Sequence, residues 1–340
     1  MTAPAGPRAA LLGDGPAATE LPVCDHYCGT EARMVKALAL QAEMGPVPVF
    51  DITLDCEDGA PVGAEAQHAA LCARIALSDG NRHGRVGVRV HPVDHPAFEA
   101  DLQTLVGQAG NRLAYVMVPK PRDVADVRHA IARVQAVAVA TGRGAALPVH
   151  VLVETHGALR EVFAIAAEPR IESISFGLMD FVSAHRGAIP RSAMTVQPDG
   201  GQFDHPLVLR AKLDIAAACH AHGKTPSHCV VTEFKDTAAL SAAATQARMR
   251  LGYTRMWSIH PDQIRPIVAA FAPTTAELAQ AIEIIRAAQA AHWAPIQHQN
   301  TLHDRASYRY FWQVITRAHA AAAAGGPAVP VEVNTAWFQP

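Results

Sequence analysis

The chain has 340 residues and a formal net charge of −2; 50% of its residues are hydrophobic and 18% are charged. This composition excludes an intrinsically disordered chain and is typical of a soluble globular protein with a large core. Nucleic acids and anionic membranes usually bind proteins with a clear basic excess, so the near-neutral charge argues against both as partners. We therefore expect a small-molecule partner.

The sequence carries no clear targeting signal. No run approaches the roughly 18 apolar residues of a membrane-spanning helix. Three prolines and Asp14 interrupt the first 20 residues, where a signal peptide would need an unbroken apolar stretch. We therefore expect a cytoplasmic protein.

The six cysteines are scattered among strand-like and helix-like segments, without the density of a disulfide-stapled domain, and we expect reduced thiols. Cys24, His26 and Cys28 have the spacing of metal ligands, but no matching second pair follows them. We interpret this trio as part of the core.

After a Pro/Gly/Ala-rich arm at residues 1–20, expected to be flexible, apolar runs alternate with Ala-rich stretches of helical period. This is the pattern of repeated βα units. The runs barely alternate with polar residues, as expected for strands buried on both faces of a parallel sheet. Eight are predicted to be strands: Leu21–Cys24, Val47–Leu54, Val86–Val90, Tyr115–Val118, Val149–Val153, Ile174–Phe176, Ser227–Val231 and Met256–Ile259.

Between these runs, apolar residues at three- and four-residue spacing predict an outer ring of amphipathic helices. The predicted helices are Glu31–Met44, Asp123–Ala140, Ala158–Ala167, Leu207–His222, Ala238–Leu251 and Pro261–Phe271. Eight parallel strands favour closure, so residues 21–272 are predicted to form one (β/α)8 TIM barrel, with an open doubly wound sheet as the alternative.

Residues 273–340 are predicted to form a C-terminal helical extension. A helix at Thr275–Ala291 leads into an aromatic segment, then into Ala-rich sequence and a Pro-containing tail. Aromatic side chains are costly in a solvated linker, so we expect them to pack against the barrel or a neighbouring subunit. This favours a homo-oligomer. The aromatic residues are Tyr308, Tyr310, Phe311 and Trp312.

Nearly every predicted strand ends in a polar or ionisable residue, whereas the opposite strand ends are mostly apolar, small or Pro-containing. Barrels of this kind build their active sites at the carboxyl ends of the strands. Any one of these residues could cap a helix instead, but the recurrence favours a shared site. The residues are Asp55, Glu57, Asp58, Arg89, His91, Lys120, Glu154, Asp180, His260 and Gln263.

Glu154 and Asp180 follow adjacent predicted strands and can give two oxygen ligands to one hard divalent cation, which suits Mg²⁺. A substrate carboxylate beside a keto or hydroxyl oxygen could chelate that ion. Arg89 would then stabilise the enolate oxygen formed when a neighbouring carbon–carbon bond breaks. Alternatively, Arg89 braces the barrel mouth in an ion pair with Glu57 or Asp58.

Six motifs in order, between about residues 30 and 285, resemble the citrate lyase β-subunit-like family, also called the HpcH/HpaI aldolase family, which includes malyl-CoA lyases. They read LDCEDGAP (54–61), VRVHP (88–92), VMVPKP (116–121), VLVETHGAL (151–159), SFGLMDF (175–181) and SIHPDQI (258–264).

The resemblance implies a (β/α)8 barrel in which Glu154 and Asp180 bind magnesium and Arg89 contacts substrate oxygens beside the metal. It implies that Glu57 and Asp58 order metal-bound water or the arginine. Lys120 and His260 are further candidate substrate-binding residues.

In relatives, a C-terminal aspartate that acts as acid or base reaches a neighbouring subunit's site. Asp304 is the candidate here, with helix capping as the alternative, and a trimer or hexamer is the implied assembly. The family's first strand carries an arginine that helps to receive the acyl carrier, and LPVCDHYCG lacks it. The carrier therefore stays open between coenzyme A and a protein.

We thus predict a lyase that cleaves, or in reverse condenses, a carboxylated 3-hydroxyacyl thioester of the citryl, malyl or citramalyl kind. The products would be a 2-oxo acid and an acyl thioester. One alternative is a metal-dependent aldolase on free 2-oxo-4-hydroxy acids, with His260 or His91 as base. Another is a subunit of a larger lyase complex that depends on an acyl-carrier protein.

Overall fold

A computed structural model describes residues 6–13, 21–197, 199–322 and 325–338. The chain divides into two compact units, one formed by Leu21–Ile267 and the other by Val268–Pro340 together with the N-terminal segment Met1–Glu20. The observed division falls after Ile267, within a helix that spans Ile264–Phe271. The boundary predicted from the sequence, after residue 272, lies five residues later.

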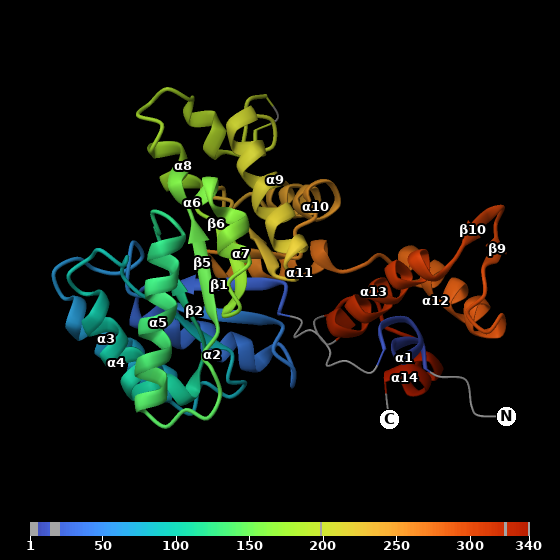
Figure 1. Cartoon of the computed structure of the whole chain (residues 1–340), viewed down its shortest axis with the longest axis horizontal. Coiled ribbons are helices and arrows are strands. Elements are labelled where there is room, and N and C mark those ends of the chain that lie inside the picture. The colour runs from blue at the N-terminus through green and yellow to red at the C-terminus, as the bar shows by residue number, and fades with distance from the viewer. Residues whose placement is uncertain (1–5, 14–20, 198, 323–324, 339–340) are drawn as a thin grey trace. The chain divides into compact units, whose positions relative to one another are not determined.

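The first unit, whose strands β1, β2, β5 and β6 are labelled in Figure 1, is a closed barrel in which each strand pairs in parallel with the next and β8 pairs with β1. The predicted TIM barrel is therefore confirmed. Its strands are β1 (Cys24–Cys28), β2 (Phe50–Asp55), β3 (Val86–Arg89), β4 (Leu113–Val118), β5 (Val149–Val153), β6 (Ile171–Phe176), β7 (Thr225–His228) and β8 (Arg255–Ser258).

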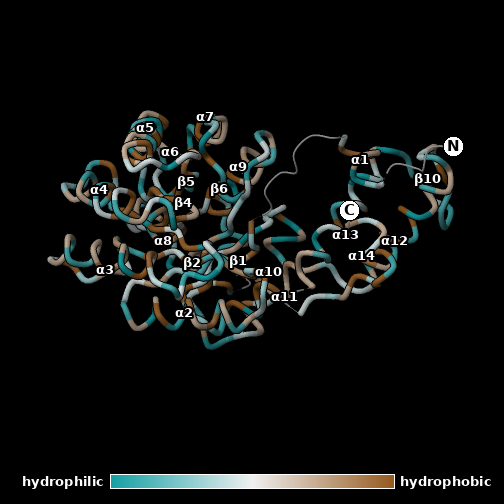
Figure 2. Tube along the Cα trace, turned by 90° about the horizontal axis from the view of Figure 1, so that it is seen from below, coloured by the Kyte–Doolittle hydropathy of each residue, from teal (hydrophilic) through white to brown (hydrophobic). Residues whose placement is uncertain are grey.

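Helices surround these strands, and Figure 2 shows the ring that they form around the labelled strands of the barrel. Most of the barrel's strand residues are buried on both faces, which explains their continuous apolar runs. The helices are α2 (Glu31–Glu43), α3 (Glu65–Leu77), α4 (Phe98–Ala109), α5 (Val124–Ala140), α6 (His156–Arg160), α7 (Val162–Ala166), α8 (Leu178–Ser183), α9 (Pro206–Ala221), α10 (Thr237–Leu251) and α11 (Ile264–Phe271), with short 3-10 turns η1 (Gly110–Arg112), η2 (Arg191–Met194) and η3 (Pro261–Gln263).

The first strand lies later in the chain than predicted. Hydropathy favours Leu21–Cys24, but the residues that pair with β2 begin at Cys24 and run through Asp25 and His26. Both polar residues are buried, at 0% and 2% exposure. The strand is inconspicuous in the sequence because these polar residues interrupt its apolar run; inside the barrel, Asp25 Oδ1 accepts the Thr53 hydroxyl and His26 Nδ1 lies 2.8 Å from Ser258 Oγ.

The amino-terminal end of the barrel contains a buried charge network, although the sequence suggested that this end is apolar. Arg255 reaches Asp51 Oδ2 at 2.7 Å and Asp25 Oδ2 at 3.1 Å, and all three side chains are fully buried. Arg85 binds the same Asp51 through two hydrogen bonds of 2.7 and 2.8 Å. Burial opposes the ionisation of Asp51, but the two guanidinium groups outweigh it and lower its pKa.

The second unit has its own core. It comprises α1 (Pro7–Leu12), α12 (Thr275–Ala290), a hairpin of β9 (Ile296–His298) and β10 (Thr301–His303), α13 (Arg305–Ala322) and α14 (Val331–Phe338). Leu11, from the arm predicted to be flexible, packs in this core with Tyr308 and Trp312. The predicted aromatic segment therefore has partners within its own unit.

Among the described residues, one helical stretch, Pro261–Ala290, is long and apolar enough to cross a membrane by length and composition. Half of its most apolar window is buried inside the protein, as in core helices. Length and hydropathy therefore do not by themselves mark this stretch as a membrane span.

Replacing Arg255 with Met should destabilise the barrel by about 3–5 kcal/mol, because it leaves two buried carboxylates with too little positive charge. Urea unfolding followed by circular dichroism measures this loss. The matched control is Arg133→Met, since Arg133 pairs with Glu99 at the surface and its loss should cost much less than the loss of Arg255. Equal stability of the two variants would contradict a structural role for the network.

Candidate metal and oxyanion site

The carboxyl-terminal ends of β2 and β3 are joined by a buried ion pair. Asp55 and Arg89 are the last residues of these strands and are register partners. The Arg89 Nε donates to Asp55 Oδ1 at 2.7 Å, and Nη2 donates to Oδ2 at 2.5 Å. Burial disfavours the charged guanidinium, but Asp55 outweighs this and raises the pKa of Arg89 further. Arg89 is therefore a fixed cation at the barrel mouth.

Asp55 also shapes the loop that follows it. Its two carboxylate oxygens accept the backbone N–H groups of Glu57 at 2.9 Å and Gly59 at 3.0 Å. Glu57 then folds back, so that its Oε2 lies 3.0 Å from Arg89 Nη1. Of the ion pairs considered from the sequence, the one between Arg89 and Glu57 is present, whereas Asp58 pairs with Lys120.

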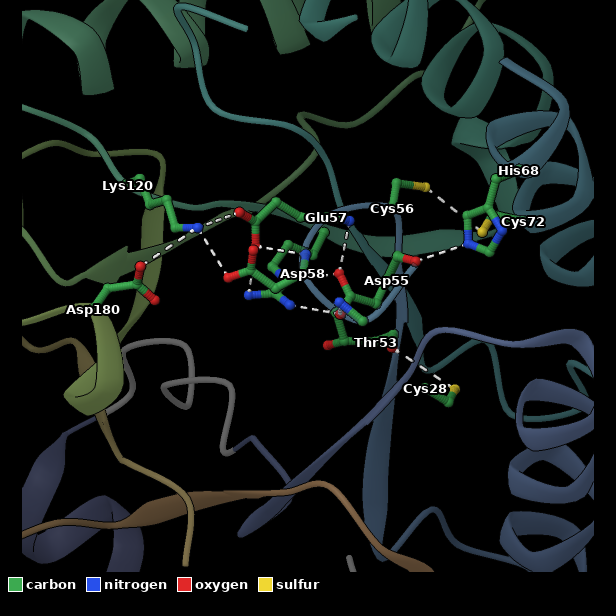
Figure 3. Close-up of polar contacts among 12 residues, drawn as sticks. Cys28, Thr53, Asp55, Cys56, Glu57, Asp58, His68, Cys72, Lys120 and Asp180 are labelled. Carbon is green, nitrogen blue, oxygen red and sulfur yellow. Dashed lines mark hydrogen bonds and ion pairs between the residues drawn. The ribbon is translucent and has the colours of Figure 1, made fainter. Parts of the chain in front are cut away.

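Lys120 connects the acidic groups of the site (Figure 3). Its Nζ lies 2.5 Å from Glu57, 2.9 Å from Asp58 and 3.6 Å from Asp180. Burial would lower the pKa of Lys120, but the hydrogen bonds to Glu57 and Asp58 raise it above its ordinary value. Its backbone lies in the left-handed region, with φ at 49°. Such backbone strain often occurs at functional sites.

Glu154 follows β5 and is 2% exposed. Its Oε1 accepts the backbone N–H of Lys120 at 2.9 Å. Gly177, which precedes α8, leaves room for the carboxylate: a Cβ at that position would lie 2.2 Å from Glu154 Oε2. Burial, and next the neighbouring charge of Asp180, raise the pKa of Glu154 well above its usual value.

The donor set fits a hard divalent cation. The cluster contains five carboxylates, from Asp55, Glu57, Asp58, Glu154 and Asp180, against two basic groups, from Arg89 and Lys120. Full ionisation would leave three negative charges in excess. Arg89 pairs with Asp55 and Glu57, whereas Glu154 is buried near the second carboxylate of Asp180. Glu154 and Asp180 are therefore the residues that could hold the ion.

Two candidate residues form their hydrogen bonds outside this network. His260 accepts the N–H of Asp262 at 3.2 Å and stacks on Phe234, so it caps the 3-10 turn η3. Asp304 belongs to the second unit, where its Oδ1 accepts the N–H of Ala306 at 2.9 Å at the start of α13. The capping expected as an alternative is present for Asp304.

The sequence placed Asp55 among the strand-end residues but gave it no role of its own. The signal was its position directly before the acidic pair in LDCEDG, on the strand next to Arg89. His91, considered as a base for the alternative aldolase, bonds instead through its backbone N–H and Nδ1 to Asp101 on α4.

A cluster of carboxylates with one fixed arginine at the carboxyl end of a parallel barrel is typical of enzymes that act with a metal ion. The matching family model, HpcH/HpaI aldolase/citrate lyase, covers residues 47–261, and the chain belongs to this family. It is a carbon–carbon lyase.

Curated relatives and solved structures agree with this assignment. An L-malyl-CoA/beta-methylmalyl-CoA lyase of Cereibacter sphaeroides is 31% identical over 74% of this chain and 81% of its own length. The crystal structure of a citrate lyase from Burkholderia xenovorans LB400 is 51% identical, covers 99% of this chain and 100% of its own, and has a TM-score of 0.84.

The fold extends to more distant structures. CitE from Mycobacterium tuberculosis in complex with magnesium, acetoacetate and coenzyme A is 21% identical and covers 89% of this chain and 100% of its own, with a TM-score of 0.68.

Replacing Asp55 with Asn should cost about 3–5 kcal/mol of folding free energy, because Arg89 would stay buried with one of its two acidic partners neutralised. Chemical denaturation monitors this change. Asp58→Asn serves as the control, since the Asp58 side chain is 57% exposed and its removal should cost below about 1 kcal/mol. A loss at position 58 as large as that at position 55 would refute the anchoring role.

Proposed function

We propose that this lyase requires magnesium and cleaves, or in reverse condenses, a carboxylated 3-hydroxyacyl thioester of the malyl, citramalyl or citryl kind. The products are a 2-oxo acid and an acyl thioester. The observation that carries the proposal is the buried Glu154 next to Asp180, with the fixed Arg89 on the same barrel mouth. The malyl-CoA lyase relatives support the thioester part.

Glu154 and Asp180 would hold the ion, and Lys120 would help to balance the remaining acidic charge. When bound, magnesium supplies Lewis-acid polarisation of the oxygens in the oxo-acid half of the substrate. Burial and the charge of Asp180 raise the pKa of Glu154, and a bound cation would favour its charged form.

Arg89 would neutralise the enolate oxygen that forms when the carbon–carbon bond breaks. A guanidinium has five N–H donors. Three contacts to Asp55 and Glu57 leave two donors for substrate oxygens. Because both acidic partners are themselves held, the arginine does not have to reorganise during the reaction.

Proton transfer to the enolate carbon is assigned to Asp304 or to a water. We propose that the protein is a cytoplasmic homotrimer or homohexamer. In this assembly, Asp304 of one subunit serves the site of another. Its capping bond to Ala306 uses one carboxylate oxygen, so the other is available for this role.

A substrate panel tests the proposed function. We expect the protein with Mg²⁺ to release a 2-oxo acid and an acyl thioester from malyl, citramalyl or citryl thioesters. Chromatography measures both products. Turnover of only free 2-oxo-4-hydroxy acids would overturn the thioester assignment. Simple hydrolysis to the free hydroxy acid would also overturn it, and one relative is named a (3S)-malyl-CoA thioesterase.

The Glu154→Gln variant should lower kcat/KM at least about 100-fold, or about 2.7 kcal/mol, because it removes a charged ligand while keeping the side chain's size. Initial rates at several Mg²⁺ concentrations measure the effect. The control is Glu99→Gln, a surface carboxylate paired with Arg133, which should retain wild-type rates. Unchanged Mg²⁺-dependent turnover in the Glu154 variant would exclude this residue as a ligand.

The Gly177→Ala variant should weaken Mg²⁺ binding about 10–100-fold, the range typical of groups that orient a metal ligand. Its new Cβ would displace the Glu154 carboxylate. Calorimetric titration with Mg²⁺ measures the change. The control is Gly144→Ala, where nothing lies within 4 Å of the added atom. Equal Mg²⁺ affinity in both variants would show that Glu154 does not need this space.

A further inference from the structure

Directly beside the acidic site lies a second cluster of ligand-type side chains. Cys56, His68 and Cys72 are all buried, and each places one potential metal-ligating atom within 4.8 Å of the others. Figure 3 shows them on the far side of Asp55 from Lys120. The function proposed above makes no use of this cluster.

The local structure explains why the three side chains meet. Cys56 directly follows β2, while His68 and Cys72 are four residues apart on α3 and so share one face of that helix. The two sulfur atoms are 3.6 Å apart. Two thiolates at about 2.3 Å from a tetrahedral zinc lie roughly 3.8 Å apart, so the observed separation needs little change.

The histidine is already oriented as a ligand. Its Nε2 lies 2.9 Å from the backbone carbonyl of Asp55, so it donates its proton there. The Nδ1 atom therefore keeps a lone pair. Metal-binding histidines usually have this arrangement, in which the second ring nitrogen donates to a carbonyl or carboxylate.

The thiol of Cys72 is also prepared for deprotonation. The hydrogen bond that Cys56 donates to Cys72 lowers the pKa of Cys72 to about 6, and it raises the pKa of Cys56. Metal ligation requires the thiolate form.

We propose that Cys56, His68 and Cys72 form a zinc site, separate from the all-oxygen site for magnesium, with water as the fourth ligand. Binding of Zn²⁺ releases the two thiol protons and gives a neutral centre of one dication and two thiolates. Sulfur and imidazole select a soft or borderline ion and disfavour Mg²⁺.

Because all three side chains are buried, the zinc holds the chain and does not meet substrate. It links the residue after Asp55 to α3, while His68 holds the Asp55 carbonyl. The ion thereby fixes the chain segment from which Asp55 and Glu57 reach Arg89. This proposal does not depend on the substrate, because it concerns the support of the loop and not the reaction.

The test is metal content and Co²⁺ substitution of the full-length protein, purified with reductant from zinc-supplemented culture. We expect one zinc per chain by elemental analysis. After replacement by Co²⁺, thiolate-to-cobalt charge-transfer absorption should appear. Both signals should be lost in Cys72→Ser and in His68→Ala. They should persist in Cys219→Ser, which removes a buried thiol on α9, and in Glu154→Gln, which alters only the oxygen site.

Wild-type protein that contains no zinc and gives no thiolate charge transfer with Co²⁺ would overturn the proposal. A disulfide between Cys56 and Cys72 under reducing purification would do so as well, since it consumes both thiolates. If the ligand variants fail to fold, titration of wild-type apoprotein with Zn²⁺ against a chromophoric chelator decides the matter. Saturation at one ion per chain supports the site, and no competition refutes it.

Discussion

The paired hydrogen bonds between Asp55 and Arg89 are the constraint on which the rest of the site depends. They close the gap between the ends of β2 and β3 and hold a guanidinium at the barrel mouth. Glu57 is positioned by the same carboxylate through its N–H, and it in turn holds Lys120. Lys120 finally positions Glu154 through its backbone. A buried pair with such geometry favours one arrangement over others more than it adds to stability.

Much of the architecture follows from the sequence alone. Eight apolar runs predicted the eight strands, because a sheet buried on both faces leaves a simple hydropathy signal. Because such barrels build their sites at the carboxyl ends of the strands, the sequence also pointed to Glu154, Asp180, Arg89 and Lys120. In the structure these residues belong to one network of charges.

The limits of that prediction have physical causes. Asp55, Glu57 and Asp58 lie within four residues, and no pattern in one sequence tells which carboxylate points inward and which stays exposed. Asp25 and His26 look like turn residues until the barrel supplies their partners. Cys56, His68 and Cys72 meet only because the fold packs the end of β2 against α3, and their spacing in the sequence does not reveal this contact.

The two ends of the barrel differ in their balance of acidic and basic side chains. At the amino end, Asp25 and Asp51 face Arg85 and Arg255, so two carboxylates meet two guanidinium groups. At the carboxyl end the acids outnumber the bases. A network with balanced charges can be buried as it stands, whereas an excess of carboxylates favours the binding of a cation. Structure and chemistry are therefore separated along the barrel axis, as is general for this fold.

The position of Arg255 has a consequence for how the protein is made. It lies in the last strand of the barrel, whereas Asp25 and Asp51 lie in the first two. On the ribosome, Asp51 can meet Arg85 early, but Asp25 emerges long before Arg255, and desolvating Asp25 without that cation is costly. The nascent sheet must therefore keep its seam open to water until β8 has been synthesised. Closure becomes a single late event, which protects the chain from sealing an incomplete barrel.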